Sequence, residues 1–357
     1  METITVRIRQ DAESFTPQEE EALRQAGRVI QNGGLAAFPT ETVYGLGGDA
    51  LDRESSRKIY AAKGRPQDNP LIVHICRLED LEKIVSRVPE EAVRIAEAFW
   101  PGPLTMILEK SERVPPETTG GLETVAVRFP AHKAAQKIIE YAGGFVAAPS
   151  ANASGKPSPT LAKYVAEDLE GRIDMIVDGG QVGIGLESTI VDLTVSPPQI
   201  LRPGYITEEM LGRVLGRVDT DAASLGADSG QAPRAPGMKY RHYAPLGELV
   251  IVEGEADLAA DYINRQTAAD HMAGEKTGVI GTREYLDRYH ADVIKCVGSR
   301  EDEDGIARSL YMILREFDDE GVTRIYSESF ACSGFGQAIM NRLLKAAGYR
   351  VVRLSGP

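Results

Sequence analysis

The sequence has few of the residues that form cross-links and metal sites. Its 357 residues include three cysteines, Cys76, Cys296 and Cys332, which are widely spaced and form no Cys-x-x-Cys pair. This spacing argues against a disulfide framework or a structural zinc site and indicates a reducing compartment. The five histidines contain no pair at metal-ligand spacing, so we expect no transition metal held by protein ligands.

A long apolar run is also missing from the start of the sequence. From Met1 to Arg7 polar and apolar residues alternate, with no stretch long enough for a signal peptide or a membrane span. We therefore expect a cytoplasmic protein that does not enter a membrane.

Positive charge is in deficit, because the formal net charge is -13. Broad nucleic-acid binding depends on Lys and Arg that neutralise phosphates, so this balance disfavours it. It does not exclude a small anionic ligand. A guanidinium about 4 Å from a phosphate gains roughly 4 kcal/mol at an effective dielectric near 20, whereas carboxylates beyond about 8 Å are largely screened by salt.

The length and the pattern of short apolar runs predict two α/β domains. Between Gly33 and Gly204 these runs alternate with Gly/Pro turns and are typical of strands. The predicted strands are 35–38, 71–75, 104–108, 125–129, 145–148, 175–177, 190–193 and 200–201. Helices are predicted at 52–63, with Asp52 as N-cap and Gly64 as the end, at 80–99 and at 133–142.

A segment rich in Ala, Gly, Ser, Asp and Pro separates the two domains. It predicts a catalytic domain at 1–218, a linker at 219–239 and a C-terminal domain at 240–357. In the C-terminal domain, strand-like runs at 249–252, 278–280, 324–326 and 351–354 alternate with helical patterns at 306–317 and 339–347. This alternation favours a smaller, Rossmann-like domain with a parallel sheet.

Two clusters of small, cationic and hydroxyl residues each follow a predicted element. They are Lys63-Gly64-Arg65-Pro66 and the segment from Pro149 to Ser158. Side chains at i and i+2 of extended backbone point to the same side, so Lys63 and Arg65 can face one ligand, as can Ser150 and Asn152. A solvated basic helix end would explain a cation at this position, but not the Gly and Pro that constrain the backbone around it.

Other polar residues in the apolar strands leave more than one interpretation open. Arg128 lies within an apolar strand and must be paired or face a cleft, where a carboxylate ligand or an internal Asp or Glu would serve equally. His74 lies in an apolar run, where a core histidine is the more frequent outcome. The segment from Pro39 to Gly48 predicts a glycine-rich turn after a strand, which either only caps backbone groups or approaches a ligand closely. The pair Gly334 and Gly336 is a poor dinucleotide signal, since close helix packing explains it as well.

Six motifs in order resemble the threonylcarbamoyl-adenylate synthase family over residues 15–210. They are 39–47, 63–71, Trp100-Pro101-Gly102-Pro103-Leu104-Thr105, Val127-Arg128-Phe129-Pro130, Ala148-Pro149-Ser150-Ala151-Asn152 and Leu201-Arg202-Pro203-Gly204. The segments 240–245 and 333–343 are similar to the long form, which has an added C-terminal domain. The resemblance implies a twisted, mixed-sheet YrdC-like α/β domain followed by the C-terminal domain.

The activity that the resemblance implies is nucleotidyl transfer. The enzyme would convert L-threonine, bicarbonate and ATP, with magnesium, to threonylcarbamoyl-adenylate and diphosphate, for modification of the adenosine beside the anticodon of tRNAs. A downstream tRNA threonylcarbamoyl transferase would be a partner, and little direct tRNA binding is expected. The alternatives are an RNA-binding module and a paralogue of the same fold with other carbamoyl or nucleotidyl chemistry.

The resemblance also assigns site residues. The catalytic residues that handle bicarbonate and phosphate would be Lys63, Arg65, Ser150 and Asn152. Threonine would be held by Thr42, His74, Arg128, Ala148, Ser150 and Ser188. ATP would be held by Arg65, Asn69, Thr124, Ser150, Ser158, Arg202 and Tyr243. Because a carbamate is unstable in water, we also expect the linker to close over the site, with Tyr240 to Tyr243 at its end as a lid over the nucleotide.

Overall fold

The computed structural model describes residues 2–10, 12–221 and 243–354, which fall into two units. The first contains 2–154 and 158–221, and the second contains 155–157 and 243–354. Most of the predicted linker, and the predicted lid apart from Tyr243, lie outside the described residues. Within the described ranges, no helix is both long and apolar enough to cross a membrane.

The first unit is built on a mixed sheet, as expected. Its described strands lie in the order β1-β8-β2-β3-β7-β4-β6-β5-β9-β10-β11. They are β1 (Ile4–Arg7), β2 (Ala36–Pro39), β3 (Tyr44–Asp49), β4 (Ile72–His74), β5 (Leu104–Glu109), β6 (Thr124–Arg128), β7 (Val146–Ala147), β8 (Met175–Asp178), β9 (Thr189–Asp192), β10 (Gln199–Arg202) and β11 (Asp219–Thr220). Parallel pairs such as β4 with β6 alternate with antiparallel pairs such as β5 with β6, which confirms the mixed-sheet α/β class.

Some helices of this unit begin with a side-chain N-cap. They are α1 (Pro17–Gln31), α2 (Arg53–Lys63), the 3-10 helix η1 (Leu78–Lys83), α3 (Glu90–Phe99), α4 (Pro116–Thr119), α5 (Lys133–Tyr141), α6 (Ala162–Leu169) and α7 (Glu208–Leu215). The prediction for α2 is confirmed: Asp52 accepts two backbone N–H groups, and Gly64 ends the helix with φ of 62°. The Thr16 capping box that starts α1 was not used in the sequence analysis.

The single helix predicted over 80–99 is wrong. The chain forms η1 and α3 as separate elements, with Pro89 as the extended N-cap of α3. Proline has no N–H for an upstream carbonyl and disfavours helical geometry in the residue before it, so a helix cannot run through Pro89 undisturbed.

The glycine-rich turn predicted over Pro39 to Gly48 is corrected in part. Only residues 40–43 turn, because β3 begins at Tyr44 and pairs antiparallel with β2. The strand glycines make room for packing: a Cβ on Gly47 would lie 2.6 Å from the Phe38 ring, and one on Gly48 would lie 3.0 Å from Ile59. Glycine here permits close packing against the sheet.

The two faces of the central strands have different roles. Val73, Val127 and Met106 belong to the main core of the unit. The opposite face carries a separate buried apolar group, which consists of Ile72, Ile107, Ala126, Ile190 and Leu201. We call this group the apolar floor. Because side chains alternate along a strand, the polar residues two positions from the floor lie on the same face.

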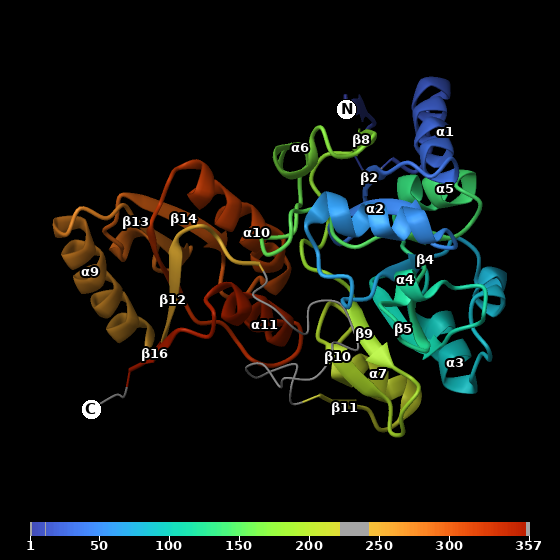
Figure 1. Ribbon diagram of the computed structural model, residues 1–357. Helices are drawn as coiled ribbons and strands as arrows, with labels where there is room; N and C mark the ends of the chain where they lie inside the picture. The colour runs from blue at the N-terminus through green and yellow to red at the C-terminus, as the bar shows by residue number, and fades with distance from the viewer. Residues whose placement is uncertain (1, 11, 222–242, 355–357) are drawn as a thin grey trace. The chain divides into compact units, whose positions relative to one another are not determined.

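The second unit is a parallel sheet in the order β14-β13-β15-β12-β16. Its strands are β12 (Glu248–Glu253), β13 (Thr277–Thr282), β14 (Val293–Gly298), β15 (Arg324–Glu328) and β16 (Val351–Arg353), and its helices are α9 (Ala256–Met272), the 3-10 helix η2 (Leu286–Arg288), α10 (Glu303–Asp319) and α11 (Gly336–Ala346). Figure 1 shows α9 on one side of this sheet and α10 and α11 on the other. The predicted parallel-sheet α/β class is confirmed, while β14 and α9 were not predicted.

In the first unit, α1 and α5 lie side by side (Figure 1), and they pack tightly at Gly27, where a Cβ would lie 2.3 Å from the Tyr141 Cβ. We expect Gly27→Ala to destabilise the fold by about 1–3 kcal/mol through overpacking. Gly212 in α7 is the matched control, because nothing lies within 4 Å of its Cβ position. Gly212→Ala should stabilise by up to about 1 kcal/mol through helix propensity. Urea unfolding checks both, and equal stability of the two variants would contradict the close helix contact.

Candidate active site

The buried ammonium of Lys63 joins the two predicted clusters. Lys63 ends α2 and is 3% exposed. Its Nζ donates to the backbone carbonyl of Ser150 and, at 2.6 Å, to that of Asn152. The Ser150 hydroxyl in turn donates to Asn152 Oδ1 at 2.5 Å. A cation, a hydroxyl and an amide are thus held together at the point where α2 meets the segment after β7.

Arg65 is placed by the turn that follows α2. Its guanidinium donates to the carbonyls of Asn69, at 3.2 Å, and Pro70, at 3.1 Å. The side chain of Asn69 is buried, and its Oδ1 has no hydrogen-bond partner within the part of the chain that the structure describes. A buried amide oxygen without a partner is rare and suggests a ligand that donates to it.

Arg128 ends β6 on the face of the apolar floor and is 4% exposed. Its Nη1 donates to Thr42 Oγ1 at 3.0 Å, and its Nη2 forms an ion pair with Glu41 Oε1 at 2.6 Å. The open question about Arg128 is therefore answered in this state: an internal glutamate pairs with it. Glu41 Oε2 is inaccessible to water and has no partner among the described residues.

His74 lies beside Arg128 in the parallel pair β4 and β6. Complete burial, and then the nearby Arg128 charge, lower the pKa of His74 to about 3. The ring is therefore neutral at physiological pH. Its Nδ1 lies 3.2 Å from the carbonyl of Ile72.

Ser188 precedes β9 and contacts two further polar groups on this face. Its hydroxyl is 2.8 Å from Thr105 Oγ1 and 3.2 Å from the guanidinium of Arg202, which also binds the Ser188 carbonyl. Glu187, the residue before Ser188, accepts a hydrogen bond from the Ser158 hydroxyl through Oε1 at 2.5 Å. Strand ends that are distant in sequence are thus joined by hydrogen bonds.

The remaining predicted residues are less closely tied to these groups. Ala148 follows β7 and donates its N–H to the Ile72 carbonyl at 2.9 Å. Thr124 is at the start of β6, four residues from Arg128, on the same face but at the opposite end of the strand. Tyr243 belongs to the second unit, where its ring stacks on Tyr311 with 5.2 Å between centroids.

The sequence analysis missed three polar residues of the site, Glu41, Thr105 and Glu187. Glu41 and Glu187 stand directly before the hydroxyl residues Thr42 and Ser188, so position beside a motif residue was an available signal. Thr105 ends the motif that begins at Trp100, but its pairing with Arg128 across β5 and β6 is visible only in the fold.

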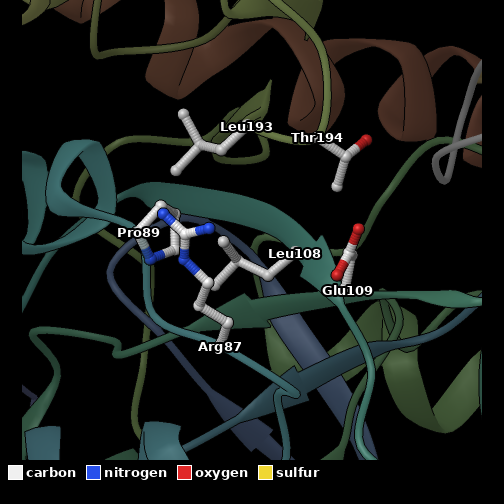
Figure 2. Close-up of a pocket in the computed structure, with 6 residues that line it drawn as sticks. All are labelled: Arg87, Pro89, Leu108, Glu109, Leu193 and Thr194. Carbon is white, nitrogen blue, oxygen red and sulfur yellow. The ribbon is translucent and has the colours of Figure 1, made fainter.

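A further pocket lies on the same unit but away from these residues. Figure 2 shows it lined by Arg87, Pro89, Leu108, Glu109, Leu193 and Thr194. It contains none of the predicted site residues. In the described ranges, no group of three or more His, Cys, Asp or Glu side chains is arranged to hold a metal ion.

Comparison with known proteins shows the family of this chain. A family model of Sua5, YciO and YrdC proteins, described as "Telomere recombination", matches residues 28–204. A second, described as "Threonylcarbamoyl-AMP synthase, C-terminal domain", matches residues 206–348. The chain is 48% identical over 352 residues to a threonylcarbamoyl-AMP synthase of Pyrococcus abyssi, with 99% of this chain and 100% of that protein covered. The chain belongs to the threonylcarbamoyl-AMP synthase family.

Two further relatives support the same family. A threonylcarbamoyl-AMP synthase of Bacillus subtilis is 47% identical over 93% of this chain and 94% of its own. The crystal structure of Pyrococcus abyssi Sua5 complexed with L-threonine matches with a TM-score of 0.93 at 48% identity, and covers 99% of this chain and 100% of that one. The family resemblance stated from the six motifs is confirmed.

The lowered pKa of His74 predicts a pH dependence of stability. Between pH 6.5 and about 3 the unfolded chain binds a proton at His74 that the folded chain does not, so this residue makes stability fall as pH falls. His74→Gln should remove that contribution and flatten the profile of unfolding free energy in this window. Urea titrations from pH 4 to 8 check this, and identical profiles for the two proteins would contradict a neutral, buried His74.

Proposed function

We propose that this chain synthesises L-threonylcarbamoyladenylate and diphosphate from L-threonine, bicarbonate and ATP, as the first step of tRNA threonylcarbamoyladenosine modification. The observation that carries the proposal is the Lys63 ammonium on Ser150 and Asn152, in a chain that matches a threonylcarbamoyl-AMP synthase over its full length. The alternatives, an RNA-binding module or a paralogue with other chemistry, are not favoured by the comparisons.

The proposed threonine site is the group around Arg128. It consists of Thr42, His74, Arg128, Ala148, Ser150 and Ser188. The guanidinium of Arg128 suits a carboxylate, because it offers several N–H donors in one plane. The neutral ring of His74 adds no second positive charge beside it.

The proposed ATP site consists of Arg65, Asn69, Thr124, Ser150, Ser158 and Arg202, while the role of Tyr243, which belongs to the second unit, stays a prediction from the family resemblance. The unpartnered Oδ1 of Asn69 supports it, since the amino group of adenine is a donor of the required kind. Asn69 precedes β4 and Thr124 begins β6, whereas His74 and Arg128 end these two strands. The parallel pair thus places Asn69 and Thr124 at one end and His74 and Arg128 at the other.

The chemistry follows from positioning and charge. The threonine amine condenses with bicarbonate held by Lys63, Arg65 and Asn152, giving a carbamate and water. A carbamate oxygen then attacks the α-phosphorus of ATP in line, and diphosphate leaves. Lys63 and Arg65 stabilise the negative charge that develops during the attack. The attack itself needs no proton transfer at the phosphorus.

Magnesium would enter with ATP, since phosphate oxygens are ligands that this ion prefers. When bound, it neutralises charge on the leaving diphosphate. The product would pass to a tRNA threonylcarbamoyl transferase, because the reactive mixed anhydride must reach its acceptor before water hydrolyses it. The transferase is therefore the expected macromolecular partner.

Lys63→Ala should lower the turnover number of threonine-dependent diphosphate release by roughly 100-fold or more, because it removes a preorganised cation from the reacting groups. Lys58→Ala is the matched control, since Lys58 lies on the same helix with an exposed side chain that binds the Gly33 carbonyl. The control should keep wild-type turnover. Near-full activity of Lys63→Ala with a normal melting curve would rule out the assigned role.

A further inference from the structure

The buried pair of Arg128 and Glu41 leaves one carboxylate oxygen unused. Glu41 Oε1 lies 2.6 Å from Arg128 Nη2, with side-chain exposures of 15% and 5%. Glu41 Oε2 has no hydrogen-bond partner in the described part of the chain and no access to water. A buried acceptor without a partner destabilises the structure, and more so where it is charged. A ligand that donates a hydrogen bond to Oε2 would remove this penalty.

The neighbouring polar groups already have partners of their own. The Oγ1 atoms of the neutral neighbours Thr40 and Thr42 are 2.9 Å apart. The Thr40 hydroxyl donates to the Val43 carbonyl, so Thr40 is hydrogen-bonded within its own turn. Thr42 Oγ1 is held by Arg128. The other carboxylate of the site, Glu187, accepts from Ser158. Glu41 Oε2 is therefore the carboxylate oxygen beside Arg128 for which the structure gives no donor.

The Arg128–Glu41 pair matches the charges of a zwitterion. An α-amino acid carries its carboxylate and its ammonium on one carbon atom, so a guanidinium and a carboxylate in contact present both complementary charges at similar spacing. A pair with no net charge also takes up a ligand with no net charge without leaving an uncompensated buried ion.

We propose that Glu41 accepts the α-ammonium group of threonine through Oε2 while it stays paired with Arg128, and so selects α-amino acids over acids that lack the amine. This inference rests on the proposed function, because it concerns the same threonine site. Glu41 is then a substrate-binding residue, in addition to a partner that neutralises Arg128.

Calorimetric titration of the full chain tests the proposal with two probes, L-threonine and 3-hydroxybutyrate, which lacks the amine. The wild type should bind threonine and bind 3-hydroxybutyrate at least 10-fold more weakly. Glu41→Gln keeps the size of the side chain but loses its charge, so it should weaken threonine binding by roughly 10- to 100-fold. Its affinity for 3-hydroxybutyrate should not fall. If Glu41 had only a structural role, Glu41→Gln would bind both ligands more weakly by the same factor.

Glu41→Asp retains the carboxylate and should keep the preference for threonine over 3-hydroxybutyrate. If Glu41→Gln does not fold, equal affinity of the wild type for the two probes would still overturn the proposal, because the ammonium would then contribute nothing. Unchanged threonine affinity in a folded Glu41→Gln would overturn the role of Glu41 alone. A wild type that binds no threonine would overturn the proposed function together with this inference.

Discussion

The site depends on a positive charge buried at the end of a sheet strand. Arg128 is almost inaccessible to water, and removal of one partner from a buried ion pair costs about 3–5 kcal/mol because the other charge is left uncompensated. Glu41 and Thr42 supply the compensation from the turn between β2 and β3. The guanidinium also lowers the pKa of His74, after burial itself, and so keeps that ring neutral.

The mixed sheet explains why such distant residues meet. Strands β4, β6 and β5 are neighbours, and their register places His74, Arg128 and Thr105 in one row. The same face carries the apolar floor, while the alternate residues of these strands belong to the main core. One face thus stabilises the unit, and the other presents polar groups at its rim. Lys63 adds further polar groups by fixing the segment from Ser150 to Asn152.

Local signals in the sequence were enough for the elements with strong punctuation, and insufficient where tertiary packing decides. Asp52 and Gly64 marked α2 correctly because caps act within a few residues. Gly47 and Gly48 suggested a turn, but they lie in β3. Only the folded chain shows that Phe38 and Ile59 occupy the space that side chains at these two positions would need. The pairing of Arg128 with Glu41 depends on a contact between residues 87 positions apart, and the sequence could only state that some partner was needed.

Diphosphate release by the purified chain is the decisive measurement for the proposed condensation of threonine, bicarbonate and ATP. The assay contains ATP and magnesium and omits threonine or bicarbonate in turn. Release should require both threonine and bicarbonate, because the carbamate must form before the α-phosphorus is attacked. Release that continues when threonine alone or bicarbonate alone is omitted would contradict the proposed chemistry while leaving the fold and the family unchanged.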